Sequence, residues 1–171
     1  MSRLTIAFAG DSGEGVQLLG NTFADYVSHL SLHYNTLPDF PAEIRAPAGK
    51  IYGVSGFQIQ YGDEQIFTAG NCLDILVAFN AAGFLRYRSR LKPNGLLIYD
   101  PSGFDAKNCK LANFEMSELE GLSVNKREIA FSTLTLNALK DSTVNEKDKD
   151  KNKKILLSNL YVFCPYSTMR K

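Results

Sequence analysis

A glycine-rich turn, GDSGEGV at residues 10–16, is the first stretch whose residue types could bind a ligand. Gly10, Gly13 and Gly15 permit positive φ and close backbone approach, and a helix that begins near Gly15 directs its N-terminal amides at the turn. The helix dipole favours a phosphate or a carboxylate there. We therefore predict that Gly10, Ser12, Gly13 and Gly15 contact a phosphate-bearing ligand. The alternative is a tight turn that only lets helix and sheet pack closely.

The spacing of this turn differs from the standard nucleotide-binding motifs. A dinucleotide fingerprint needs glycine where this chain has Ser12, and Asp11 places a carboxylate where a pyrophosphate would lie. No Lys-Ser or Lys-Thr pair follows the glycines, so the turn is not a Walker loop. The motif alone thus leaves the ligand open.

A second candidate is the segment DFPAEIRAPAG at residues 39–49. Pro41 and Pro47 stiffen it, and in an extended backbone Glu43 and Arg45 share one face. A rigid loop that displays a charged pair suits recognition of a partner or an anionic group, because docking orders little of it. The alternative is an internal Glu–Arg pair that braces the loop. We expect Glu43 and Arg45 beside the glycine turn, near the carboxyl end of the first strand.

The remaining reactive side chains predict no catalytic centre in this chain. His29 and His33 are four residues apart without a neighbouring cysteine or carboxylate pair, which favours a solvent-facing pair over a metal site. Cys72, Cys109 and Cys164 are isolated, so we expect neither a disulfide framework nor zinc or iron–sulfur ligation. No nucleophile elbow is present.

Composition indicates one globular domain. The chain has 171 residues, 44% of them hydrophobic, which is enough for one core. Its 19 basic and 18 acidic residues nearly cancel, which argues against nucleic acid or an anionic membrane as a partner. No apolar stretch approaches the ~20 residues that span a bilayer, and the N-terminus does not resemble a signal peptide. We predict a cytoplasmic location.

The elements that must position these residues follow from hydrophobic periodicity. Near-continuous apolar runs at Leu4–Phe8, Asp74–Phe79 and Leu96–Tyr99 predict the central strands of a mostly parallel sheet, covered on both faces. Apolar residues at helical spacing predict a helix from Gly15 to about Leu32. Ser55–Tyr61 and Gln65–Thr68 flank a turn, which predicts an antiparallel hairpin.

Weaker patterns complete this α/β fold. They predict short strands at Tyr34–Leu37 and Val124–Phe131, and helices at Ala81–Leu91 and Ser132–Leu139, the last with Ser132 as its N-cap. Strand and helix alternate, so we predict a Rossmann-like, doubly wound, mostly parallel sheet with an inserted β-hairpin.

The end of the chain differs in character. We assign residues 1–142 to the domain and 143–171 to a charged linker with an apolar tail. The linker has almost no apolar area to offset the entropy of ordering, so trypsin should cut first among its lysines and leave residues 1 to about 147 folded.

Three stretches in this order resemble the gamma domain of 2-oxoacid:ferredoxin oxidoreductases. They are GDSGEGVQLLGNTF, PDFPAEIRAPAGKIYGVSGFQIQYG and CLDILVAFNAAGFLRYRSRLKPNGLLIYD, and together the likeness covers about residues 3–140. The PAEIR loop at 41–45 is its most specific part. The likeness is closest to the fused gamma/alpha subunit of the 2-oxoglutarate type.

The resemblance implies one part of a larger enzyme. That family oxidatively decarboxylates a 2-oxoacid to acyl-coenzyme A and passes electrons to ferredoxin, with thiamine diphosphate, magnesium and iron–sulfur clusters on alpha and beta partner domains or subunits. The gamma domain would cover the active site on the side where coenzyme A enters, so Gly10, Ser12, Gly13, Gly15, Glu43 and Arg45 become its expected ligand contacts. The chain alone would be inactive.

Two departures from the family pattern leave alternatives open. Ala46-Pro47-Ala48-Gly49 stands where many relatives have consecutive glycines, and NKKILLSNLYVFCPYSTMRK replaces the expected start of an alpha domain. We therefore expect a truncated or frame-shifted fragment. A free-standing nucleotide-binding or scaffold module and a small independent enzyme remain the alternatives.

Overall fold

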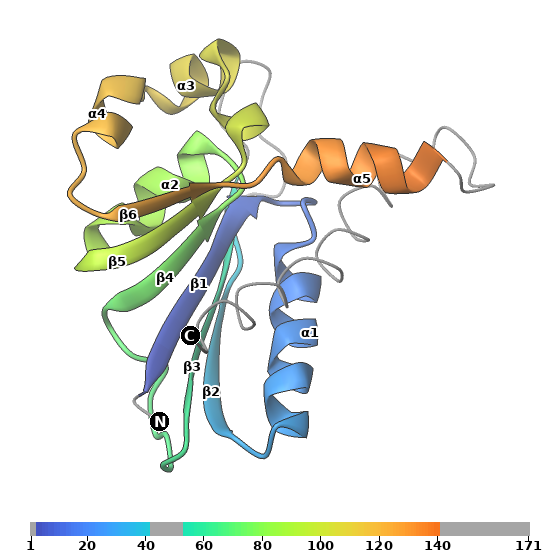
Figure 1. Ribbon diagram of the computed structural model, residues 1–171, viewed down its shortest axis with the longest axis vertical. Coiled ribbons are helices and arrows are strands. Elements are labelled where there is room, and N and C mark those ends of the chain that lie inside the picture. Colours follow the sequence, from blue (N-terminus) through green and yellow to red (C-terminus); the bar gives the residue numbers. More distant parts are fainter. Residues whose placement is uncertain (1–2, 42–52, 141–171) are drawn as a thin grey trace.

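The computed structural model describes residues 3–41 and 53–140, which form a six-stranded sheet with helices on both faces (Figure 1). The strands are β1 (Leu4–Asp11), β2 (His33–Asp39), β3 (Val54–Gly62), β4 (Leu73–Ala78), β5 (Leu91–Tyr99) and β6 (Asn125–Glu128). The helices are α1 (Val16–His29), α2 (Ala81–Tyr87), α3 (Ala106–Ala112), α4 (Met116–Glu120) and α5 (Phe131–Lys140), with short 3-10 turns η1 (Arg88–Arg90) and η2 (Pro101–Phe104).

The sheet is mostly parallel, with the order β2-β3-β1-β4-β5-β6. β1, β4, β5 and β6 pair in parallel. β3 is antiparallel to both of its neighbours, β1 and β2, so it is the one reversed strand among the described residues. The α/β class and the central positions of β1 and β4 confirm the prediction from the apolar runs.

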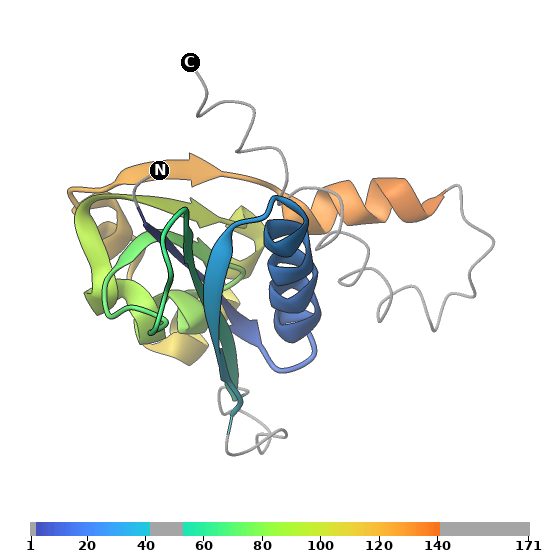
Figure 2. The ribbon, with the colours of Figure 1, turned by 90° about the horizontal axis from the view of Figure 1, so that it is seen from below.

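The two faces of the sheet carry separate cores. One lies under α1, where Phe8 and Ile59 are fully buried and Phe23 packs edge-on against Phe8 with ring centroids 5.8 Å apart. The other lies under α2, α3 and α4 and includes Phe84 and Leu97. Figure 2 shows α1 on one face of the sheet and α5 projecting away from the body of the domain; Phe131 at the start of α5 belongs to the same core as α1. Ligands of such sheets bind outside the carboxyl ends of the parallel strands.

The inserted hairpin has a different partner from the one predicted. Residues 65–68 form no strand; β3 instead forms the antiparallel pair with β2, in register Leu37 with Gln58, and inserts between β2 and β1. The physical reason is burial, because this place puts Phe57 and Ile59 under α1, which an isolated two-stranded ribbon could not do.

Smaller differences concern the last elements. β6 ends at Glu128 and α5 already begins at Phe131, so Ser132 lies in the first turn of α5 rather than at its N-cap. Its N–H and hydroxyl both donate to the Asp100 carboxylate. Glu43 and Arg45, Cys164, and the assigned linker and tail lie outside the described residues. Among the described residues no helix is long and apolar enough to cross a membrane.

Candidate ligand and docking site at the carboxyl edge of the sheet

The glycine turn lies where β1 ends and α1 begins. Gly13 and Gly15 have φ of 104° and 77°, values that a side chain rarely adopts, so these glycines are required by the backbone. The N-cap residue of α1 is Gly15, which has no side chain to cap the helix. The predicted turn is therefore present, and it directs the positive end of α1 outward.

Two carboxylates lie on this turn as well. Glu14 Oε2 accepts the N–H of Asp11 at 2.8 Å and an amide hydrogen of Asn80 at 3.1 Å. Asn80 Nδ2 also donates to Asp11 Oδ1 at 2.8 Å, while its own Oδ1 accepts the N–H of Gly83 at the start of α2. Asn80 is buried, and it ties the turn after β1 to the turn after β4. Asp11 and Glu14 also make further interactions.

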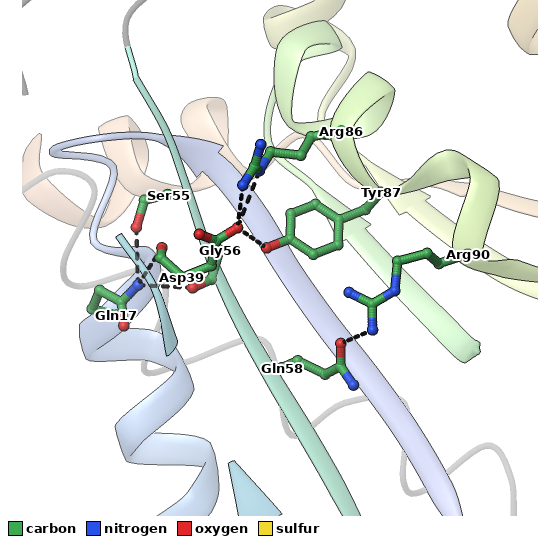
Figure 3. A network of polar contacts seen from close by, with 8 residues as sticks. All are labelled: Gln17, Asp39, Ser55, Gly56, Gln58, Arg86, Tyr87 and Arg90. Atoms are coloured by element: carbon green, nitrogen blue, oxygen red, sulfur yellow. Dashed lines mark hydrogen bonds and ion pairs between the residues drawn. The ribbon is translucent and has the colours of Figure 1, made fainter. Parts of the chain in front are cut away.

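The described residues on either side of the predicted recognition loop are fixed at this edge (Figure 3). Before the loop, the amide of Gln17 in α1 donates to the Asp39 carbonyl at 3.2 Å. After the loop, the same amide donates to Ser55 Oγ at 3.0 Å and to the Gly56 carbonyl at 2.8 Å, and the N–H of Ser12 donates to the Gly53 carbonyl at 3.0 Å. One side chain and the glycine turn thus join both ends of the loop.

The Asp39 carboxylate joins the same stem to α2. Its Oδ2 accepts from Arg86 Nη2 at 2.9 Å, from Arg86 Nε at 3.1 Å and from the Tyr87 hydroxyl at 2.8 Å. The hydrogen bond to Asp39 raises the pKa of Arg86. Burial, and then the hydrogen bond to Asp39, raise the pKa of Tyr87 to about 12, so Tyr87 remains a donor at neutral pH.

Next to the contacts of Asp39 with Arg86 and Tyr87, the side chain of Arg90 lies half-buried against β3. Its Nη2 donates to Gln58 Oε1 at 2.5 Å and to the Gly70 carbonyl at 3.3 Å, and its Nε donates to the Asn71 carbonyl at 2.9 Å. Its guanidinium carbon lies 5.7 Å from the centre of the Tyr87 ring. The positive guanidinium of Arg90 is thus held by neutral oxygen acceptors, the side-chain amide of Gln58 and two backbone carbonyls.

A further anchor lies after β5. Asp100 is buried, and its two carboxylate oxygens accept four hydrogen bonds of 2.8–3.0 Å, from the N–H and hydroxyl of Ser102 and of Ser132. Phe131 packs on Phe79 with ring centroids 5.4 Å apart. These contacts fix the base of α5 at the same edge as the glycine turn.

Of the predicted site residues, the structure places Gly10, Ser12, Gly13 and Gly15 in one turn at the carboxyl edge, beside the stems of the segment that carries Glu43 and Arg45. Sequence reasoning missed the network of Gln17, Asp39, Arg86 and Tyr87. Its bonded partners are up to 48 residues apart in the chain, as Asp39 and Tyr87 are, so no local spacing indicated it. His29 and His33 are both exposed.

A mostly parallel, open α/β sheet with a glycine turn at its carboxyl edge defines a Rossmann-like domain. The chain belongs to the pyruvate ferredoxin/flavodoxin oxidoreductase family, whose model matches residues 5–146. This confirms the family inferred from the three sequence stretches.

Individual relatives agree with that assignment. The chain is 36% identical over 168 residues to the KorA subunit of 2-oxoglutarate oxidoreductase from Mycobacterium tuberculosis, an alignment that covers 94% of this chain and 26% of that protein. The chain therefore spans about a quarter of the length of this curated relative.

Solved structures share the fold at lower identity. A 2-oxoglutarate:ferredoxin oxidoreductase from Magnetococcus marinus superposes with a TM-score of 0.65 at 22% identity, over 98% of this chain and 31% of that one. The gamma subunit of a keto/oxoacid ferredoxin oxidoreductase from Geobacter sulfurreducens gives a TM-score of 0.55 at 14% identity, over 93% and 95% of the two chains. The described residues thus share the fold of these two oxidoreductase chains.

Proposed function

We propose that this chain is the gamma-type part of a 2-oxoacid:ferredoxin oxidoreductase of the 2-oxoglutarate type. The enzyme would oxidatively decarboxylate a 2-oxoacid to an acyl-coenzyme A and pass the electrons to ferredoxin. The observation that carries this proposal is the family match over residues 5–146, together with 36% identity to KorA. A cytoplasmic location accompanies the proposal.

We assign to this chain a role in assembly and on the coenzyme A side of the site, and not the thiamine chemistry. In residues 3–41 and 53–140 no group of three or more metal-ligating side chains lies together. The division itself rests on the family resemblance, which implies magnesium and iron–sulfur clusters on partner domains or subunits. Thiamine diphosphate would supply the carbanion stabilisation there.

Coenzyme A would be received beside the glycine turn. The N-terminus of α1, whose N-cap residue is Gly15, offers N–H donors to an anion, while the carboxylates of Asp11 and Glu14 oppose one. The turn alone is therefore a poor phosphate cradle. We propose that Arg45 supplies the missing positive charge and that Glu43 orients it. Gly10, Ser12, Gly13 and Gly15 would contribute backbone donors and close approach.

Reconstitution with the alpha and beta partners tests the proposal. We expect the chain to form a complex that reduces ferredoxin when 2-oxoglutarate and coenzyme A are both present. Arg45→Ala should lower assembly or coenzyme A-dependent turnover at least tenfold, and should change the melting temperature of the free chain by less than about 2 °C.

The matched control is Arg3→Ala, which removes an exposed arginine paired with Glu64 near the amino end of β1. It should leave turnover unchanged. A chain that fails to associate with either partner, or whose addition leaves turnover unchanged, would refute the proposed function. A large drop in the melting temperature of Arg45→Ala would instead indicate that Glu43 and Arg45 form an internal pair that braces the loop. Tight binding of a nucleotide by the isolated chain would favour a free-standing module.

A further inference from the structure

A pocket of about 270 Å³ opens beside the edge strand β2, on the face of the sheet that α2 covers. Its polar wall is formed by Arg86, Tyr87 and Arg90, which reach from α2 and η1 toward β3 (Figure 3). Its apolar wall is formed by Leu37 and Pro38 of β2. No step of the proposed function uses this pocket.

The charge balance of the pocket is uneven. Arg86 is paired with Asp39 at 2.9 Å, whereas no carboxylate among the described residues pairs with Arg90. Among the described residues, the charged members of the lining are Asp39, Arg86 and Arg90, whose charges leave one positive charge over. Half-buried cations are stabilised by a nearby anion more than exposed ones, because solvent screens them less.

The guanidinium of Arg90 is also held in a fixed orientation before any ligand binds. Its Nε and Nη2 hydrogens go to Asn71, Gln58 and Gly70, whereas Nη1 makes none of these bonds. Gln58 is itself only 1% exposed and is held by bonds to the carbonyls of Ala69 and Gly70. A guanidinium fixed in this way loses little entropy when its remaining N–H groups bind an acceptor.

The lining distinguishes between kinds of anion. Asp39 keeps one negative charge in the pocket, so a phosphate dianion would leave one negative charge unbalanced, whereas one carboxylate restores neutrality. A cavity of about 150 Å³ can hold benzene, so 270 Å³ has room for a carboxylate with a short aliphatic chain. Leu37, half exposed at 50%, gives that chain an apolar contact.

We propose that this pocket binds small organic monocarboxylates, with the carboxylate on Arg90 Nη1 and the aliphatic part against Leu37 and Pro38. Every described residue that forms the site belongs to this chain, so binding can be measured without partner subunits.

Sodium butyrate is the probe, titrated into the full ¹⁵N-labelled chain at constant ionic strength. We expect saturable shifts of the Arg90 Nε–H and of the amides around Leu37, Gln58 and Tyr87. Sodium phosphate at equal ionic strength should bind at least tenfold more weakly. Arg90→Gln should weaken butyrate binding at least tenfold. Arg90→Lys should weaken it less, because lysine keeps the positive charge although it lacks the planar guanidinium donors.

Arg88→Gln is the matched control, because Arg88 lies in the same turn but pairs with Glu118 at 2.6 Å. It should bind butyrate as the wild type does. Leu37→Asp is the second variant: it leaves the contacts of Arg90 intact, stands at an exposed edge position, and supplies a carboxylate of its own. It should abolish binding in a folded protein.

Three results would overturn the proposal. They are shifts that do not saturate, butyrate affinity unchanged in both Arg90→Gln and Leu37→Asp, and tighter binding of phosphate than of butyrate. The second variant keeps the test decisive if Arg90→Gln proves unstable.

Discussion

Gly56→Ala tests whether β3 and α2 are in contact as tightly as the structure shows. Gly56 lies on the face of β3 toward α2, paired with Ala9 and Asp39. An ideal Cβ built there would lie 2.6 Å from Cζ of Tyr87 and closer still to its hydroxyl oxygen. Among the described residues the glycines with positive φ are 13, 15 and 70, so alanine at Gly56 suffers no backbone strain. The whole cost is steric.

The magnitude follows from two effects. Overpacking a well-packed site costs about 1–3 kcal/mol. Displacing Tyr87 also loses its hydrogen bond to Asp39, and a bond to a charged acceptor contributes about 1.5–3 kcal/mol. We expect Gly56→Ala to lower the free energy of unfolding by roughly 3–5 kcal/mol. Urea unfolding followed by far-UV circular dichroism measures this, since the chain has no tryptophan.

A double-mutant cycle separates this cause from general damage to the strand. Tyr87→Phe removes the nearest atom, so it should cost less in the Gly56→Ala background than in the wild type, with a coupling energy of at least about 1 kcal/mol. Gly62→Ala in the same strand is the control: its nearest neighbour would be Arg3 Cα at 3.3 Å, and we expect a small effect. Additive effects of Gly56→Ala and Tyr87→Phe, within about 0.5 kcal/mol, would refute the reasoning.

Three further predictions concern buried polar groups. Asn80→Ala should destabilise the domain by about 2–3 kcal/mol, because it removes the cap of α2 and leaves two carboxylates short of a donor; denaturant unfolding measures this. Asp100→Ala should cost more than Ser132→Ala in the same assay, since the first change orphans four donors, whereas the second removes only the Ser132 hydroxyl and keeps its backbone N–H donor. The pKa values of Tyr87 and Tyr99 are each raised to about 12, chiefly by burial. Both hydroxyls therefore stabilise the fold fully below pH 10 and lose that contribution as the pH rises toward 12, so Tyr87→Phe should flatten the alkaline decline in melting temperature.

The central strands of the sheet could be predicted because their apolar sequences alone indicate that both of their faces are buried. Near-continuous apolar runs such as Asp74–Phe79 are stable only when both faces are covered, which fixes a central, parallel position. The glycine turn was equally readable, since Gly13 and Gly15 do adopt positive φ. These are local signals.

The place of β3 could not be predicted from local signals. Gln58 and Gln60 alternate with apolar residues, which is typical of a strand with one solvated face, yet Gln58 is 1% exposed. Its burial is compensated by Arg90 and by two carbonyls from a loop that follows in the chain. Similarly, the contact of Asp39 with Arg86 depends on the folded topology, which no spacing in the sequence records.

The reversed strand β3 has a consequence for biosynthesis. β1 ends at residue 11, but both of its neighbours, β3 and β4, begin only at residues 54 and 73. At about 5–20 residues per second, the ribosome needs several seconds to deliver them. During that interval the strand Leu4–Asp11, the most apolar part of the N-terminus, has been translated with neither of its hydrogen-bonding partners yet made. The nascent chain therefore presents an unpaired aggregation-prone segment, and slower translation would lengthen its dependence on chaperones.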